Sequence, residues 1–307
     1  MLFVDILDKK GKVLIEEVER LFNLALKEQT HEGNLLLLLV NGSYDLKTTS
    51  GFTTSDGKKL SPYVIGPREE GHSAQTHYKF INQYRTSYIH SLDFKDYLKL
   101  FDFSPERAKE IDKLTEVEEM SIQLEMLIYL KIWEADMTIK KLYQFTRILC
   151  TEDYDWHFKV SESSRDTTSL GTRQEVIRTL IRDKIKGVSP ILHNAIKECY
   201  KTQIRNSIAH SNYSFQGRNI HPNNYVEKDK AAQLRNLPFD EWIEIFHSTL
   251  LIHNAVIKLD NLIREHYGAL ATRGQTLSVK ITEPAVRQYA MQVEYRPEWQ
   301  DFRWKKD

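Results

Sequence analysis

Residues 204 to 213 read IRNSIAHSNY and bring together side chains that suit chemistry on a phosphodiester. Arg205 carries a planar, permanently charged guanidinium that fits a phosphate, and His210 can accept or donate a proton near neutral pH. Asn206 adds a hydrogen-bonding amide. Attack by an RNA 2′-hydroxyl needs a base, an acid for the leaving oxygen and positive charge for the phosphorane. These residue types can supply such groups without an obligatory metal.

Helical spacing alone does not bring the arginine and the histidine together. On an ideal helix Asn206 and His210 share a face, whereas Arg205 and His210 are separated by roughly 140°. The last turn could deform before Ser211, or the long arginine side chain could fold around. Alternatively, two copies of the helix end could meet across a two-fold axis. Two copies would also supply both proton-transfer groups, so we expect a homodimer with a composite site.

The same three residues also have a purely structural interpretation. Arg205 would pair with an acid, Asn206 would cap the helix end, and His210 would be a solvated histidine favoured by the helix dipole. An arginine five residues before a histidine occurs often by chance. Spacing alone therefore favours this structural interpretation.

The segment RNSIAH closely resembles the Arg-x4-6-His signature of HEPN domains, with asparagine directly after the arginine and small or apolar residues before the histidine. The surroundings are similar as well: core helices first, the motif at the end of a later helix, then a loop and a long closing helix. The resemblance covers residues 105 to 267. It implies that Arg205 and His210 form the catalytic pair and that Asn206 orients or polarises them.

By this resemblance we expect a helical, dimeric, metal-independent endoribonuclease that leaves a 2′,3′-cyclic phosphate. Many HEPN ribonucleases act in antiviral defence or as toxins, so RNA, a second copy and an antitoxin or regulatory protein are the expected partners. Some toxin members place a tyrosine two residues after the histidine, whereas Tyr213 stands three residues after it. A toxin-like role is therefore not predicted for Tyr213.

Two other functions fit the sequence. The first is an inactive HEPN-like module that serves RNA binding or dimerisation, in which the motif helix is an interface element. The intact set of Arg205, Asn206 and His210 favours the enzyme over this module. The second is a helical scaffold whose loop at 41–77 recognises another protein.

Two sets of basic residues at four-residue intervals are candidates for binding RNA phosphates: Arg178, Arg182 and Lys186, then Lys197 and Lys201. The first set would form a stripe on the helix before the motif. The second set precedes Arg205 at the same spacing and favours a local basic groove. The alternative is a solvated face, in which the first set is partly paired with Glu175 and Asp183.

Glu125 lies inside the most apolar helical segment, where an ionised carboxylate is costly without a partner. HEPN folds often present a polar residue from an earlier helix to the arginine. By resemblance, Glu125 is therefore a candidate partner that orients Arg205. Alternatively, Glu125 occupies a narrow polar edge of its helix together with Lys131.

No metal or cofactor is predicted. Asp153, Asp155 and His157 alternate, so a strand would place all three on one side as possible ligands. Their context, TEDYDWHF, is more typical of a turn. The chain also contains no glycine-rich phosphate loop, HExxH or GxSxG motif.

Composition limits the electrostatic and cellular setting. The 307 residues include 43 Lys plus Arg and 43 Asp plus Glu, so any basic surface must be local. Cys150 and Cys199 belong to no CxxC pair, which favours a reducing cytoplasm. The N-terminus does not resemble a secretory signal, and the apolar run 35–40 is too short to span a bilayer. We expect a soluble, cytoplasmic protein without a membrane partner.

The elements that must position the motif are mainly helical. Apolar periodicity predicts a helix at 12–28 and a second element at 33–40, before an irregular, glycine- and proline-punctuated insertion at 41–77. Ser104, Pro105 and Glu106 form a helix start. The following segment, 105–150, lacks glycine and further proline and predicts one very long helix or two joined ones, with the core at 122–133.

The second half continues with helices. A polar connection at 151–172 precedes predicted helices at 173–186, 190–210 and 239–266, with a loop at 211–238. In the last forty residues, apolar and polar side chains alternate as they do in strands, which predicts a small hairpin. The expected fold is mainly α: a HEPN-like helical bundle at 105–267, an irregular N-terminal region at 1–104 and a small β hairpin in a C-terminal appendage at 268–307.

Overall fold

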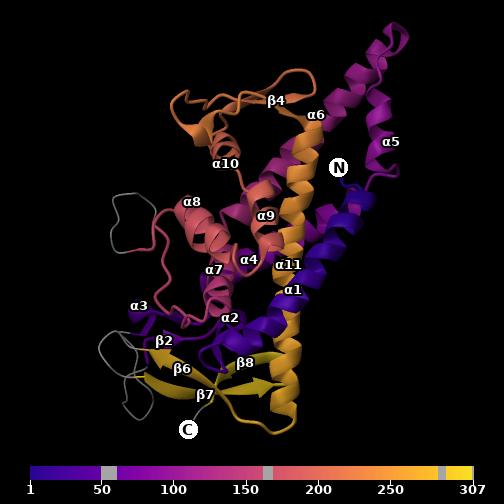
Figure 1. Ribbon diagram of the computed structural model, residues 1–307. Helices are drawn as coiled ribbons and strands as arrows, with labels where there is room; N and C mark the ends of the chain where they lie inside the picture. The colour runs from indigo at the N-terminus through magenta and orange to yellow at the C-terminus, as the bar shows by residue number, and fades with distance from the viewer. Residues whose placement is uncertain (50–60, 162–168, 283–287, 306–307) are drawn as a thin grey trace. The chain divides into compact units, whose positions relative to one another are not determined.

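The protein is mainly helical in a computed structural model that describes residues 1–49, 61–161, 169–282 and 288–305 (Figure 1). The chain divides into two compact units, and each unit draws on three separate stretches. The first consists of Met1–Glu17, Ala74–Thr138 and Ile191–Ala255, and the second of Val18–Ser73, Ile139–Pro190 and Val256–Asp307. The boundaries expected near residues 104 and 267 do not coincide with this division, because long helices contribute to both units.

The first unit contains the motif. Its elements are α1 (Val4–Glu28) as far as Glu17, most of α4 (Arg68–Ser87), α5 (Phe94–Leu98), η1 (Lys99–Phe101), η2 (Pro105–Arg107), α6 (Ala108–Trp133), α9 (Pro190–Cys199), α10 (Thr202–Ala209), β3 (Tyr213–Phe215), β4 (Asn219–Pro222), η4 (Lys230–Ala232), β5 (Leu237–Pro238) and α11 (Phe239–Thr272) as far as Ala255. Strands β3, β4 and β5 form an antiparallel sheet within the predicted loop 211–238. In Figure 1, β4 lies beside α10.

The core of the first unit is centred on α6, as the apolar segment 122–133 predicted. Its fully buried side chains include Ile122, Tyr129 and Trp133. The helix is not enclosed on every side, however, because Leu127 is 44% exposed. The predicted segment 105–150 forms two joined helices: α6 ends at Trp133, and α7 (Asp136–Leu149) begins after two residues.

The second unit carries α2 (Asn34–Leu39), β1 (Ser43–Tyr44), α3 (Leu46–Thr49), β2 (Tyr63–Val64), α7, α8 (Arg173–Glu175), η3 (Val176–Asp183), β6 (Leu277–Thr282), β7 (Gln288–Arg296) and β8 (Asp301–Trp304). The C-terminal hairpin is a three-stranded antiparallel sheet in the order β6-β7-β8. α2 packs on this sheet so closely that a Cβ on Gly33 would lie 2.2 Å from the carbonyl oxygen of Ser278. Glycine is therefore required at that contact.

The irregular insertion is shorter than expected. β1 and β2 pair in antiparallel fashion, and α4 already begins at Arg68, inside the predicted loop 41–77. The part of that loop at 50–60 lies outside the described residues. Among the residues that are described, no helix combines the length and the apolar character needed to cross a membrane.

A neutral histidine ties the start of α1 to α11 inside the first unit. His247 is fully buried; its Nε2 accepts a hydrogen bond from the Phe3 backbone N–H at 2.9 Å, and its Nδ1 faces the Ile243 carbonyl at 2.7 Å. This pattern fixes a neutral ring protonated on Nδ1. Burial lowers the pKa of His247 to about 4, because the imidazolium would lose its hydration.

We expect His247 to make the protein acid-sensitive. In the unfolded chain its pKa is near 6.5, so the stability is complete above that value and is lost as the pH falls towards 4. The loss should reach on the order of 3 kcal/mol. Urea unfolding of the wild type at a series of pH values should show this loss as a fall in the free energy of unfolding. A His247→Gln variant should be less stable at pH 7.5 and should lose less between pH 6.5 and 4; an equal loss in both proteins would contradict the assignment.

Candidate functional site

A buried tyrosine interrupts the helix that leads to the motif. The predicted helix 190–210 is divided into α9, which ends at Cys199, and α10, which begins at Thr202. The Tyr129 hydroxyl on α6 donates to the Cys199 carbonyl at 3.0 Å and accepts from the Lys201 N–H at 3.3 Å. It thus satisfies two backbone groups that the break would leave unpaired. Burial raises the pKa of Tyr129 well above its ordinary value, so the hydroxyl stays protonated.

The end of α10 displays the candidate histidine. The Ser211 N–H donates to the Ile208 carbonyl at 3.1 Å, and the Asn212 N–H donates to the Ser207 carbonyl at 2.7 Å. These two bonds form a Schellman cap, with Ser211 in the left-handed region at φ 51°. His210 is the last residue before this reversal, and its side chain is exposed. Backbone geometry therefore directs the histidine away from the packed face of α10.

The candidate arginine is held by two neighbours. Arg205 is half-buried, its Nε contacts the Glu134 carboxylate, and its Nη1 donates to Asn206 Oδ1 at 2.7 Å. The hydrogen bond to Glu134 is the main cause that raises the pKa of Arg205, so the group stays charged. Asn206 therefore contacts the guanidinium directly. The pairing with an acid is also the contact that the structural interpretation required of Arg205.

The side chain that meets Arg205 is Glu134 and not Glu125. Glu125 lies nine residues earlier on α6, about 13 Å away along the axis. Its buried carboxylate accepts hydrogen bonds from Tyr84 at 2.9 Å, Ser121 at 3.0 Å and Trp242 at 2.8 Å, and it also contacts the Met1 amine. The sequence correctly indicated that Glu125 needs partners, but these partners belong to the core.

The basic candidates fall in different parts of the fold. Lys197 and Lys201 belong to the first unit and are exposed, but the break between α9 and α10 removes the continuous four-residue stripe with Arg205. The other three candidates, Arg178, Arg182 and Lys186, belong to the second unit. Arg182 donates to both oxygens of Asp183 at 2.7 and 2.9 Å, which matches the alternative of a solvated, internally paired face.

The described residues contain no cluster of three ligands that could hold a metal. Asp155 accepts hydrogen bonds from the Tyr143 hydroxyl at 3.2 Å and from the His157 backbone N–H at 2.9 Å. Asp153 contacts the Thr30 hydroxyl. Asp153 and Asp155 are thus held by hydrogen bonds within the protein, Asp155 partly within its own turn.

An ion pair anchors the sheet that follows the motif. Arg218, in the turn between β3 and β4, donates to both oxygens of the buried Glu118 on α6 at 2.8 and 2.7 Å. It also donates to Asp240 at 2.7 Å, and its guanidinium lies 3.8 Å from the ring centre of Phe101. The segment after His210 is therefore fixed to the same helix that holds Arg205. The sequence indicated no role for Arg218, Glu118 or Glu134, because their pairing is long-range.

We expect the left-handed residue after His210 to limit stability. A side chain at φ 51° costs about 1 kcal/mol relative to glycine. Ser211→Gly should therefore raise the free energy of unfolding by roughly 0.5–1 kcal/mol, measured by urea denaturation. Ser211→Ala is the matched control and should give no such gain, because alanine keeps the Cβ. Equal effects of the two substitutions would argue against the cap.

In comparisons with known proteins, no family model, curated protein or solved structure matches the chain. The candidate site therefore rests on the residues themselves. Arg205, Asn206 and Glu134 form one contacting group, and His210 follows at the end of the same short helix.

Proposed function

We propose that the chain is a metal-independent endoribonuclease of the HEPN type. The observation that carries the proposal is the end of α10, where a charged, oriented arginine and an exposed histidine lie within one and a half helical turns. Arg205 would neutralise the scissile phosphate and His210 would transfer a proton. The proposed roles in antiviral defence or growth arrest in the cytoplasm, with an antitoxin as partner, depend on this activity.

The Arg205–Glu134 contact supports a pre-oriented phosphate clamp. The contacts of Arg205 with the described residues use Nε and Nη1, whereas a guanidinium has five N–H donors. Nη2 would then be available to a phosphate oxygen. A carboxylate behind the guanidinium fixes its plane, and fixing a catalytic group in advance lowers the cost of ordering it in the transition state.

The same contact supports a second candidate, an inactive HEPN-like module for RNA binding or dimerisation. A structural arginine is paired with an acid in just this way, and the glutamate offsets the positive charge that a phosphate needs. The two functions differ in whether the chain cleaves RNA at all, which a direct assay resolves.

We expect His210→Ala and Arg205→Gln each to lower the rate of RNA cleavage at least about 100-fold, because each removes a group that acts in the transition state. Purified protein would be incubated with labelled RNA in EDTA, and the products tested for a 2′,3′-cyclic phosphate. His221→Ala on β4 is the matched control and should remain active.

Melting temperatures should change little in His210→Ala, since that side chain is exposed. Full activity of His210→Ala would refute the catalytic role of the histidine. Loss of activity in EDTA, restored by a divalent ion, would refute the metal-independent mechanism. Binding of RNA without cleavage by the wild type would favour the inactive module.

The proposed homodimer has a candidate surface on α6. Val117, Met120 and Leu127 are 61%, 66% and 44% exposed, and the half-buried Leu124 lies between them. Their spacing of three, four and three residues is the heptad pattern by which two helices pair. An apolar stripe of this kind is self-complementary across a two-fold axis. Its last member precedes Glu134 by seven residues, so the stripe leads towards the end of α6 that holds Arg205.

We expect Met120→Glu combined with Leu127→Glu to convert a dimer into a monomer and to abolish cleavage, because one copy supplies one histidine. Sedimentation velocity measures the oligomeric state. Gln123→Glu, an exposed position beside the stripe, is the control and should stay dimeric. In subunit mixing with a ninefold excess of His210→Ala, a shared site should leave roughly a hundredth of the activity, against roughly a tenth for independent sites. An active monomer would refute the composite site.

A further inference from the structure

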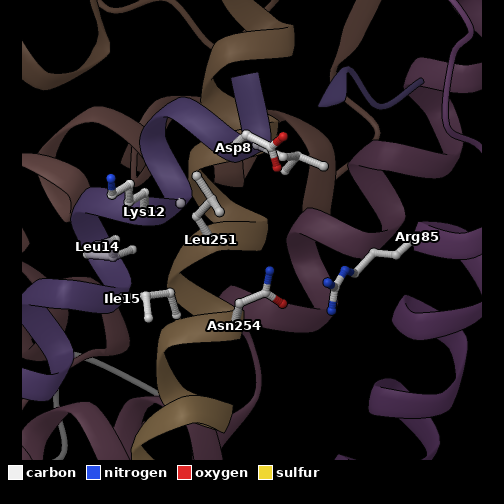
Figure 2. Close-up of a pocket in the computed structure, with 9 residues that line it drawn as sticks. Asp8, Lys12, Leu14, Ile15, Arg85, Leu251 and Asn254 are labelled. Atoms are coloured by element: carbon white, nitrogen blue, oxygen red, sulfur yellow. The ribbon is translucent and has the colours of Figure 1, made fainter. Parts of the chain in front are cut away.

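A cavity of about 550 Å³ lies between α1, α4 and α11 in the first unit, apart from the motif residues (Figure 2). Its walls include four aliphatic side chains, namely Leu7, Leu14, Ile15 and Leu251. Three charged side chains also line it: Asp8 and Lys12, one turn apart on α1, and Arg85 on α4. This size and this mixture of an apolar wall with a few polar groups are typical of small-molecule sites.

The polar groups at the cavity are incompletely satisfied by the protein. Asn254 Oδ1 is buried and has no hydrogen-bond partner among the described residues. A buried acceptor without a donor costs free energy. Within the described part of the chain, no carboxylate is in ion-pair distance of the half-buried Arg85. Asn254 and Arg85 thus line the same cavity, and the Asn254 oxygen and the Arg85 guanidinium each lack a complement among the described residues.

Figure 2 shows how these groups are arranged. The guanidinium of Arg85 and the amide of Asn254 turn towards each other, and the Asp8 carboxylate lies on one side of them. The amino group of Lys12 points to the opposite side of the view from Arg85. A ligand that presents a carboxylate to Arg85, an N–H donor to Asp8 and an apolar body to the aliphatic walls would complement these groups.

We propose that this cavity binds an α-amino acid with an apolar side chain. The α-carboxylate pairs with the Arg85 guanidinium, whose fork geometry matches a carboxylate. The α-ammonium donates to the Asp8 carboxylate. The side chain packs against Leu14, Ile15 and Leu251, where its burial supplies most of the affinity. The site is independent of the proposed ribonuclease activity.

The test is calorimetric titration of the full chain with L-phenylalanine and L-leucine. Two analogues of phenylalanine each lack one charged group: phenethylamine lacks the carboxylate, and N-acetylphenylalanine lacks the ammonium. We expect at least one of the two amino acids to bind. The two analogues of phenylalanine, or isopentylamine and N-acetylleucine if leucine alone binds, should bind at least about 10-fold more weakly. No heat from either amino acid at millimolar concentration overturns the proposal. Equal binding of the N-acetyl compound also overturns it, because the site would then select any organic anion.

Variants locate the binding in the cavity. Arg85→Gln and Asn254→Leu should each weaken binding at least about 10-fold, while Arg85→Lys should retain part of it. Asp112→Asn on α6 is the matched control outside the cavity and should bind like the wild type. Arg85→Gln changes a half-exposed side chain, so it remains informative if Asn254→Leu fails to fold. Unchanged binding by a folded Arg85→Gln variant would place the ligand elsewhere and overturn the proposal.

Discussion

The requirement that buried polar groups find partners organises the first unit around α6. A carboxylate or hydroxyl enclosed in this helix's packed face is costly unless a specific group meets it, so each one specifies a neighbour. Three buried positions on α6 act in this way, each holding a different segment: Glu118 with Arg218, Glu125 with Tyr84 and Trp242, and Tyr129 with the backbone of Cys199 and Lys201. Just after α6, the half-buried Glu134 holds Arg205. The position of the candidate site follows from these ties.

The consequence for α10 is that both of its ends are fixed independently. Tyr129 satisfies the break before Thr202, and the Schellman cap at Ser211 closes the other end. Between them lie only eight residues, too few to form a stable helix alone. Tertiary contacts, and not helix propensity, therefore determine where Arg205 and His210 lie.

Sequence patterns predicted the elements better than their connections. Apolar periodicity located α1 and the long closing helix α11, although both extend beyond the predicted bounds, because periodicity marks the buried face and not the ends. It did not reveal the break at Tyr200 and Lys201, since the residue that stabilises the break is seventy-two positions away from Lys201. The division into two units was hidden for a similar reason, because long helices shared by both units give no composition shift at the boundary.

For the candidate site, the sequence identified residue types but not partners. Burial of Glu125 was predictable from its apolar surroundings, and so was its need for donors. The donors that meet Glu125 depend on the packing of α4 and α11 against α6. Helical periodicity in the sequence does not reveal this packing. The sequence did not indicate a role for Glu134, because this residue follows the last turn of α6, where charged residues are common. Local pattern thus predicts that a polar group needs a partner, whereas the fold decides which one.

The pairing of Arg205 with Glu134 also constrains any reaction at this site. The two charges nearly cancel, so one copy of the site offers a phosphate little net attraction beyond directed N–H donors. Additional positive charge would have to come from a protonated His210, from the exposed Lys197 and Lys201, or from a second copy. Because the whole chain carries no net charge, no long-range field compensates for this balance. A catalytic role for α10 therefore favours an assembly that gathers charge locally, and a two-fold arrangement does so by doubling every donor at the cleft.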